Sequence, residues 1–230
     1  MEDELLEIPL FPLGLVLFPG MVQPLHIFEP RYREMMNRCL DGAGTFGITL
    51  AMPESVLLHE VPARVGVLAR ILDYHRLPDG RFNLLTVGGR RFEIVEMMRD
   101  RPYLRGLVRL LPEELGPGPV AELAAEARRL LDEYLAIVLS DADDGDKGIA
   151  IPSDSIELSY FLAVLLPCED SAKQELLEAP AADVRLAREL DLLRHEITRA
   201  RDAAAEERAD RLTGAPASDD RPPSGHYLPK

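Results

Sequence analysis

The chain has 230 residues, enough for one large domain or two small ones, and 47% of them are hydrophobic, as in an ordinary globular protein with a core. Its formal net charge of −14 disfavours a protein devoted to nucleic acid or to anionic membranes. No apolar run approaches the length of about 18 residues that a membrane span needs. The acidic N-terminus lacks the basic start of a signal peptide, so we expect a cytoplasmic protein.

The first apolar stretch is interrupted by four prolines, at positions 9, 12, 19 and 24. Proline inside a helix costs about 3 kcal/mol, and inside a strand it removes a hydrogen-bond donor from the ladder. We therefore expect short extended segments broken by tight turns, the clearest of them at Pro19-Gly20. A single short helix is expected next, because Pro30 suits the first helical position and Glu29 can cap it. Apolar residues then recur at helical spacing as far as Gly42.

Residues 45–111 read as strands with short connections. The residues 77–81, LPDGR, predict a tight hairpin turn, and the glycines of 87–91, VGGRR, predict a turn or a bulge between two strands. So many strands with one short helix predict a closed or nearly closed sheet over residues 1–111. The candidate strands are 45–52, 55–61, 66–74, 81–87, 90–98 and 103–111.

Beyond the Pro- and Gly-rich residues 112–119, the pattern changes to helices, which predicts an α-helical bundle over residues 112–212. The helix that begins near Asp154 is apolar nearly all round, so we expect it to be central and to share an interface with the sheet. Cys39 and Cys168 fall in apolar helical patterns and are interpreted as buried, inert thiols. Residues 213–230 are rich in Pro, Ser, Gly and Asp and are predicted to be a disordered tail.

Several motifs in one order resemble the Lon N-terminal (substrate-binding) domain family, and specifically its bacterial members that carry this domain without the rest of the protease. They are PLFPLGLVLFPG, PLHIFEPRYREMM, FGITL, VGVLARI, LPDGRFNLLTVGGRRFEI, KQELLE and RLARELDLL, spread between residues 8 and about 197. The resemblance implies an α+β fold, with a PUA-like antiparallel β pseudo-barrel followed by an α-helical bundle. In Lon this domain helps to recognise unfolded or tagged protein substrates, while separate ATPase and Ser–Lys protease domains act on them.

No motif in the sequence indicates catalysis, a cofactor or a metal. The phosphate-binding pattern GxxxxGK[ST] does not occur, and neither HxxxH nor HExxH is found. Ser171 and Lys173 are two residues apart on a helix and therefore do not face each other as a dyad would. The acidic residues that start at Asp141 lack the Gly and Glu of a calcium loop. We therefore expect no enzymatic activity.

The favoured hypothesis is a non-enzymatic module that binds proteins or peptides, with a role as an adaptor or chaperone-like factor as its more specific form. Its expected partners are unfolded or extended protein segments, or a protease or chaperone. We expect the binding surface where the first strands, the IFEPRY helix start and the GGRRF turn converge, with added main-chain hydrogen bonds along an open barrel edge. The candidate residues are Phe28, Glu29, Arg31, Tyr32, Arg90 and Arg91.

Two alternatives remain open at this point. The first is structural: Phe28 packs, Glu29 pairs with an arginine, and Tyr32 covers the barrel. The second is RNA binding, because PUA-like barrels can bind RNA and residues 61–111 hold ten arginines against five acidic residues. These arginines are spread along the strands, the chain has no Trp, and the later residues are strongly acidic, all of which disfavours nucleic acid.

Overall fold

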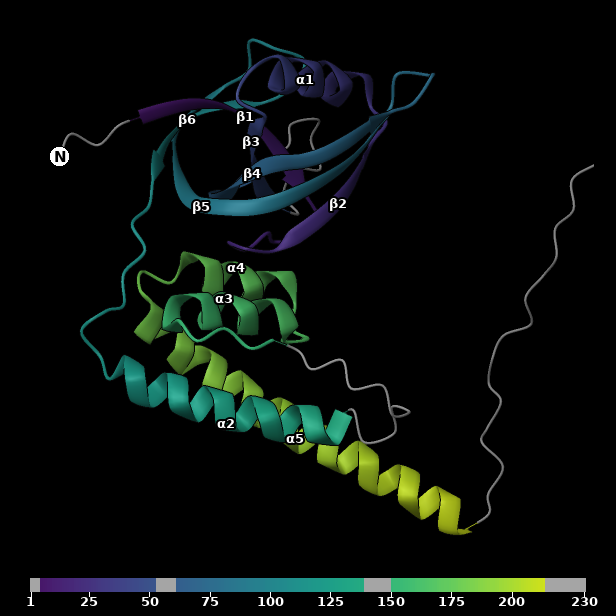
Figure 1. Cartoon of the computed structure of the whole chain (residues 1–230), viewed down its shortest axis with the longest axis vertical. Helices are drawn as coiled ribbons and strands as arrows, with labels where there is room; N and C mark the ends of the chain where they lie inside the picture. The colour runs from purple at the N-terminus through teal and green to yellow at the C-terminus, as the bar shows by residue number, and fades with distance from the viewer. Residues whose placement is uncertain (1–4, 53–60, 139–149, 214–230) are drawn as a thin grey trace, which may run out of the picture.

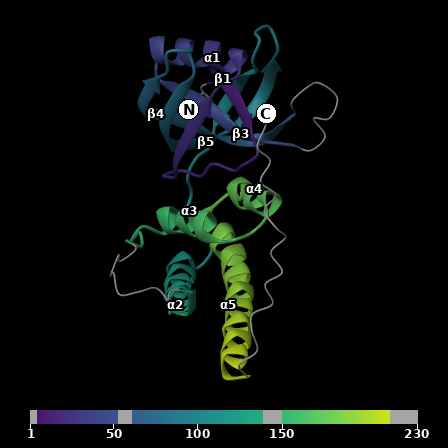
Figure 2. The same cartoon turned by 90° about the vertical axis from the view of Figure 1, so that its right-hand side faces the viewer.

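The computed structural model describes residues 5–52, 61–138 and 150–213, with side chains as far as residue 206. Within these ranges six strands form a nearly closed ring, and helices lie on two opposite sides of it, α1 on one side and α2 to α5 on the other (Figures 1 and 2). The strands are β1 (Leu5–Leu13), β2 (Val22–Ile27), β3 (Thr45–Ala51), β4 (Pro62–Arg76), β5 (Phe82–Met98) and β6 (Arg105–Leu110). The helices are α1 (Pro30–Asp41), α2 (Val120–Val138), α3 (Ser155–Leu165), α4 (Asp170–Glu178) and α5 (Ala182–Thr213).

The strand order is β2-β5-β4-β3-β1-β6, and a further pairing of β5 with β6 closes the ring. The long strand β5 makes this closure possible, because its first part pairs with β2 and its last part with β6. All pairs are antiparallel except β1 with β3, which is parallel. The α+β class and the barrel-like sheet followed by helices are therefore confirmed.

The first prolines lie inside one strand instead of separating several. Residues 5–9 of β1 pair with β6, and residues 10–13 pair with β3. Pro9 is the last residue of β1 that pairs with β6, so it lies where β1 changes from one partner strand to the other. A missing backbone N–H donor costs least at such a position. The expectation of short pieces broken by turns is wrong for Pro9 and Pro12, whereas Pro19-Gly20 does form a turn, with Gly20 at a φ of 79°.

Of the other predictions about strands, one needs correction. The stretches 81–87 and 90–98 form the single strand β5, and the glycines between them belong to a bulge and not to a turn. The predicted strand at 55–61 lies almost entirely outside the described residues. The hairpin turn at 77–81 is confirmed: the amide of Leu77 donates to the carbonyl of Arg81, and Gly80 has a φ of 83°.

Helix α1 begins at Pro30 and ends before Gly42, as predicted. Glu29 occupies the N-cap position, but its side chain accepts no capping hydrogen bond and instead pairs with Arg31 at 2.8 Å. The buried face of α1 packs on the core of the ring, which explains why this one helix interrupts the run of strands. Cys39 lies on that face, and burial raises its pKa to about 11.

Helix α3 is central, as its all-round apolar pattern predicts. Tyr160 and Ala163 belong to the core of the ring, while Leu158 and Leu162 belong to the core of the helical region. Its start is fixed by Asp154, whose carboxylate accepts from the amides of Ile156 and Glu157. Cys168 follows α3 and is only partly buried, which corrects its placement within a helix.

The ring and the helical region share one hydrophobic cluster, which confirms the predicted interface. Leu176 and Leu177 of α4 lie in that cluster with the strand residues Phe46 and Val67. The connection after β6 is also fixed, because the amide of Ala182 donates to the carbonyl of Glu114 at 2.9 Å. Among the described helices, none is both long and apolar enough to cross a membrane.

Candidate functional site

A pocket of about 650 Å³ lies where the ring meets the helical region, and both parts line it. The ring contributes the connection between β1 and β2, the start of β2 and the bulge of β5, and the helical region contributes mainly α3. Most of the lining side chains are apolar or aromatic, as in most sites that bind organic ligands or peptides. These are Pro19, Met21, Val22, Pro152, Ile156, Tyr160, Phe161 and Val164.

The ring side of the pocket depends on Gly88. The amide of Gly88 donates to the carbonyl of Met21, and the amide of Gly20 donates to the carbonyl of Gly88, both at 2.9 Å. A Cβ atom on Gly88 would lie 2.1 Å from the carbonyl oxygen of Phe18, so only glycine allows this approach. This contact holds Met21 and its neighbours at the mouth of the pocket.

A bulge in β5 sends two neighbouring arginines in opposite directions. Val67 of β4 pairs with Arg91 and Ala69 pairs with Gly88, so β5 has one more residue than β4 over this interval. Arg90 is exposed and lines the pocket, whereas Arg91 is buried, with 1% of its surface accessible. The bulge predicted for these glycines therefore decides which arginine a ligand can reach.

Arg91 joins the ring to the end of α4. Its Nη1 donates to the carbonyls of Leu177 at 2.8 Å and Ala179 at 2.7 Å, and its Nε donates to Glu113 at 3.0 Å. The last carbonyls of a helix have no partners within the helix, and the negative end of the helix dipole lies there. A buried guanidinium is therefore well placed to satisfy them.

A second buried arginine, Arg185 of α5, completes this network. Its Nε donates to the carbonyl of Leu176 at 3.1 Å, and its Nη2 donates to the hydroxyl of Tyr160 at 3.1 Å. The Arg185 guanidinium also lies 3.9 Å from the centre of the Tyr160 ring. Tyr160 in turn donates to Glu113, which also lines the pocket, so the floor of the pocket is part of the ring–helix junction.

Burial sets the charge states of this network. It raises the pKa of Tyr160 above its usual range, so the hydroxyl keeps its proton and remains a donor. Burial also lowers the pKa of Arg185 and raises that of Glu189 well above its ordinary value, although Arg185 opposes the second shift. Among the described residues no hydrogen-bond partner is found for either carboxylate oxygen of Glu189.

The rim of the pocket carries two charges of opposite sign. Arg90 projects from the ring side and Glu157 from α3, and both side chains are exposed. Within the described part of the chain neither charged group has an ion-pair partner. Both are therefore free to contact a bound molecule.

The candidate residues from the sequence do not all meet. Phe28 is 60% exposed and stacks on His26, so it does not pack inside the protein as the structural alternative assumed. Tyr32 is buried against Phe11, and the Arg31 guanidinium lies over its ring at 4.5 Å. These residues lie at the α1 side of the ring, away from α3 (Figures 1 and 2).

Of the six candidate residues only Arg90 lines the pocket, so the IFEPRY and GGRRF motifs do not meet there. Tyr32 and Arg91 are interior residues that a partner could reach only if the fold opened. Sequence reasoning missed the residues of α3, above all Tyr160 and Phe161. The sequence did contain an indication of these residues, because α3 is apolar nearly all round and has more apolar side chains than the neighbouring helices can cover.

The described residues contain no cluster of three or more His, Cys, Asp or Glu side chains suited to a metal ion. Lys173 Nζ donates to the carbonyl of Val164 at 3.4 Å, and the structure gives it no contact with Ser171. What the arrangement offers is an apolar, partly open pocket with fixed polar groups, which suits binding.

Residues 7–195 match the substrate-binding domain of the ATP-dependent protease La (Lon). The chain belongs to the Lon substrate-binding domain family. It is 31% identical over 204 residues to Lon protease 2 of Herpetosiphon aurantiacus, covering 84% of this chain and 24% of that protein. It is 28% identical to the Lon protease of Cytophaga hutchinsonii, over 83% of this chain and 24% of that protein. The 230 residues thus span about a quarter of the length of these relatives.

Two solved structures share this fold. A Lon N-terminal domain protein from Xanthomonas campestris is 28% identical, with a TM-score of 0.61 over 81% of this chain and 98% of the other. The N-terminal domain of the Lon protease from Mycobacterium avium complex shares the fold, with 20% identity and a TM-score of 0.64 over 81% of this chain and 97% of the other. The Lon-type ring and helices are thus found in both.

Proposed function

We propose that this protein is a non-enzymatic Lon-type module that binds unfolded or extended protein segments in the cytoplasm, as an adaptor or chaperone-like factor. The observation that carries the proposal is the pocket between ring and α3. It is large enough for two or three apolar side chains, and its lining is mainly apolar. An unfolded segment exposes such side chains, whereas a folded partner conceals them.

The edge of the sheet supports recognition through side chains more than through added strand pairing. Among the described strands, β2 pairs only with β5, so its other edge is open within that sheet. Pro24 lies in the middle of that edge and has no amide hydrogen to donate. The carbonyl of Pro24 already accepts from the Gln23 side chain at 3.0 Å. The expected main-chain hydrogen bonds along this edge are therefore replaced, in our proposal, by contacts in the pocket.

Substitution of Val22 by glutamate tests the proposal. Val22 lines the pocket and is 53% exposed, so a charge there should block apolar ligands while changing stability by less than about 0.5 kcal/mol. We expect Val22→Glu to weaken binding of a reduced, carboxymethylated protein about tenfold or more, the size of a hot-spot effect. Fluorescence anisotropy measures the binding, and thermal melting checks the fold.

Val95→Glu is the matched control. Val95 is also a strand valine and is 44% exposed, but it does not line the pocket. Equal weakening by the two substitutions, or no weakening by Val22→Glu in a protein that remains folded, would remove the pocket from the proposal.

The RNA-binding alternative loses support in the structure. Arg64 and Arg109 pair with Glu93, Arg105 pairs with Asp100, and Arg91 is buried. Much of the positive charge between residues 61 and 111 is thus neutralised within the ring. Retention of the protein on immobilised RNA at about 0.15 M salt would favour the alternative, because only close phosphate contacts withstand that screening.

A further inference from the structure

We propose that the pocket prefers dipolar protein segments, in which an acidic residue and a basic residue flank the apolar side chains that enter it. The acidic residue pairs with Arg90 on the ring side of the pocket, and the basic residue pairs with Glu157 on the α3 side. This inference rests on the proposed function, to which it adds the class of client segment that the pocket selects.

Each side of the pocket presents one available charge. Among the described residues that line the pocket, the charged ones are Arg90, Glu113 and Glu157. Arg90 comes from β5, whereas the connection between β1 and β2, which forms the rest of the ring side, holds no charged residue between positions 14 and 21. Glu157 is the only charged lining residue from α3. The ring side is therefore positive and the α3 side negative.

Glu113 does not alter this arrangement, because its carboxylate is already paired. One oxygen accepts a hydrogen bond from Nε of Arg91 at 3.0 Å, and the other accepts from the hydroxyl of Tyr160. A basic group of a client would have to compete with both of these partners for the carboxylate. Of the three charged lining residues, Arg90 and Glu157 are thus the two that a client can engage.

Two further charges near the start of α3 oppose each other. The carboxylate of Asp154 accepts from the amides of Ile156 and Glu157 at 2.9 and 3.0 Å. Next to it, Nη2 of Arg128 donates to the carbonyl of Ser153 at 2.7 Å. These two groups have opposite signs, and both are directed at the backbone. Glu157 therefore sets the sign of the α3 side of the pocket.

Both rim charges stand on a backbone that is held in place. The residue after Arg90 is the buried Arg91, and Gly88 is hydrogen-bonded to the connection between β1 and β2. Glu157 lies in the first turn of α3, directly after the N-cap Asp154. Within the described part of the chain, neither Arg90 nor Glu157 forms an ion pair, with each other or with another residue. The two charged groups are therefore fixed in position but unpaired.

Binding of an apolar segment makes these unpaired charges matter. Apolar side chains that fill the pocket displace water from its rim, and a charged group that loses water without gaining a partner costs free energy. An opposite charge on the client offsets this cost, whereas a like charge adds repulsion. A dipolar segment therefore satisfies both rim groups, but a segment with two like charges satisfies one group and is repelled by the other.

Four nine-residue peptides with blocked ends test the preference. All contain leucine, glycine and phenylalanine at the centre, flanked by one glutamate and one lysine, by two glutamates, by two lysines, or by two glutamines as the neutral reference. We expect the mixed peptide to bind about twofold to tenfold more tightly than either like-charged peptide at about 0.15 M salt, because exposed ion pairs are individually weak. Fluorescence anisotropy measures the binding, and the difference should shrink near 1 M salt.

Charge reversal at the rim should change which peptide is preferred. Arg90→Glu makes both sides of the pocket negative, so we expect it to prefer the peptide with two lysines. Glu157→Lys makes both sides positive, so we expect it to prefer the peptide with two glutamates. The double variant exchanges the two signs and should again prefer the mixed peptide, because an extended segment can bind in either direction. Such recovery would not follow from damage to the fold.

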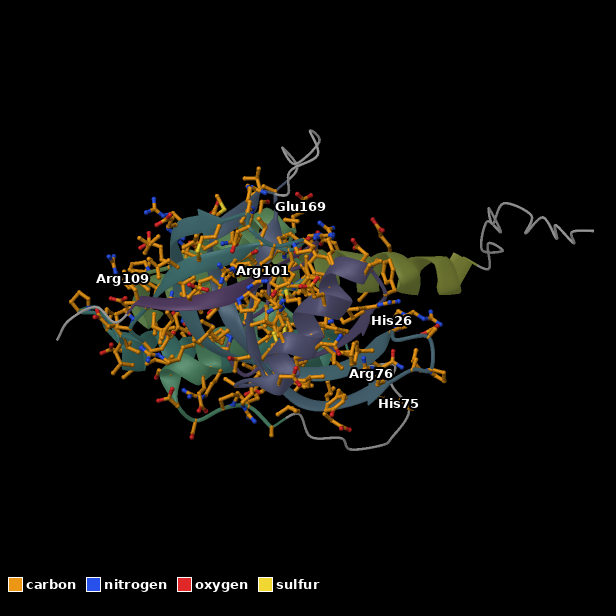
Figure 3. All side chains as sticks on the ribbon, turned by 90° about the horizontal axis from the view of Figure 1, so that it is seen from above. His26, His75, Arg76, Arg101, Arg109 and Glu169 are labelled. Carbon is orange, nitrogen blue, oxygen red and sulfur yellow. The ribbon has the colours of Figure 1, made fainter. Side chains whose placement is uncertain are left out.

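Arg101→Glu and Glu175→Lys are the matched controls. Both residues are exposed and neither lines the pocket; Arg101 lies elsewhere on the ring (Figure 3), and Glu175 lies on α4. Each control alters the net charge of −14 by the same amount as the corresponding rim variant. We expect both controls to keep the preference of the wild type for the mixed peptide.

The outcomes separate this inference from the proposed function. Equal binding of the four peptides, lost in Val22→Glu, would overturn the dipolar preference and leave the proposed function intact. A preference for two lysines in the wild type and in both single rim variants would also overturn it, because the net charge and not the rim would then decide. No binding of any of the four peptides would overturn both proposals.

Discussion

Arg90 and Arg91 are adjacent in the sequence but have opposite roles, because the β5 bulge turns one toward the pocket and the other toward the interior. A buried arginine is costly unless its hydrogen bonds are satisfied. Arg91 meets this requirement with three carbonyls and the carboxylate of Glu113. It is therefore a structural brace between ring and helices, whereas its neighbour is available to a ligand.

Replacing each arginine by alanine should separate these roles. Arg91→Ala leaves the α4 carbonyls and Glu113 without their partner, and we expect it to lower the free energy of unfolding by about 3–5 kcal/mol. Arg90→Ala should change stability by less than about 0.5 kcal/mol while weakening client binding. Urea unfolding followed by circular dichroism measures both. Similar stability losses in the two variants would contradict the assignment of Arg91 as the brace.

Glu189 lies in the interior beside Arg185, without a hydrogen-bond partner among the described residues. Burial raises its pKa well above the ordinary value, while Arg185 draws it down less strongly. The folded protein thus retains a proton that the unfolded chain releases above about pH 4.3. The contribution of this proton to the free energy of unfolding therefore falls as the pH rises from about 4.3 toward the pKa of Glu189 in the folded protein.

Glu189→Gln tests this linkage, because glutamine has the shape of the protonated acid and cannot ionise. We expect the variant to match the wild type near pH 4 and to become the more stable of the two as the pH rises to 7.5. The free energy of urea unfolding at several pH values is the measurement. A variant that is less stable than the wild type at pH 7.5 would show an ionised Glu189 paired with Arg185.

At the scale of elements, β2 is the strand whose edge is open in the described sheet. Open edges invite pairing with other chains, and proline is one of the devices that prevent it. Pro24 and the Gln23 side chain together remove a donor and an acceptor from the centre of this edge. The apolar face beside it can thus remain exposed for clients without promoting strand-to-strand association.

Pro24→Val should restore the missing donor and make β2 a continuous edge. We expect the variant to keep its fold and to aggregate faster, with β-sheet content in the aggregate, because valine favours strands. Thioflavin fluorescence and light scattering measure this, with Pro167→Val, an exposed proline outside the strands, as the control. Aggregation no faster than in the control would show that the edge is protected in some other way.

At the scale of the whole molecule, the ring and helical region are joined by a common core and by the two buried arginines. Leu176, Leu177 and Tyr160 from the helices complete the cluster of the ring. A boundary near residue 111, as the sequence suggests, would leave these contacts unmade in either fragment. We propose that the two parts fold as one cooperative unit although they look separate along the chain.

Hydrogen exchange in increasing urea tests this cooperativity. We expect peptides from β5 and from the buried part of α5 to lose protection at the same urea concentration, because neither core is complete alone. Residues 1–112 expressed separately should bind a hydrophobic dye. Loss of protection in α5 at clearly lower urea than in β5 would show two independent units.

The sequence by itself determined that strands come first and helices follow, the hairpin turn at 77–81 and the helix starts at Pro30 and Asp154, because proline, glycine and capping residues act through local backbone geometry. It also determined the family, through motifs that recur in a fixed order. Only the tertiary structure decided the site. Whether Arg90 or Arg91 reaches solvent depends on a bulge set by pairing with β4, and Tyr160 meets Glu113 across 47 residues of chain. Such contacts depend on packing between residues far apart in the sequence, which local sequence patterns do not predict.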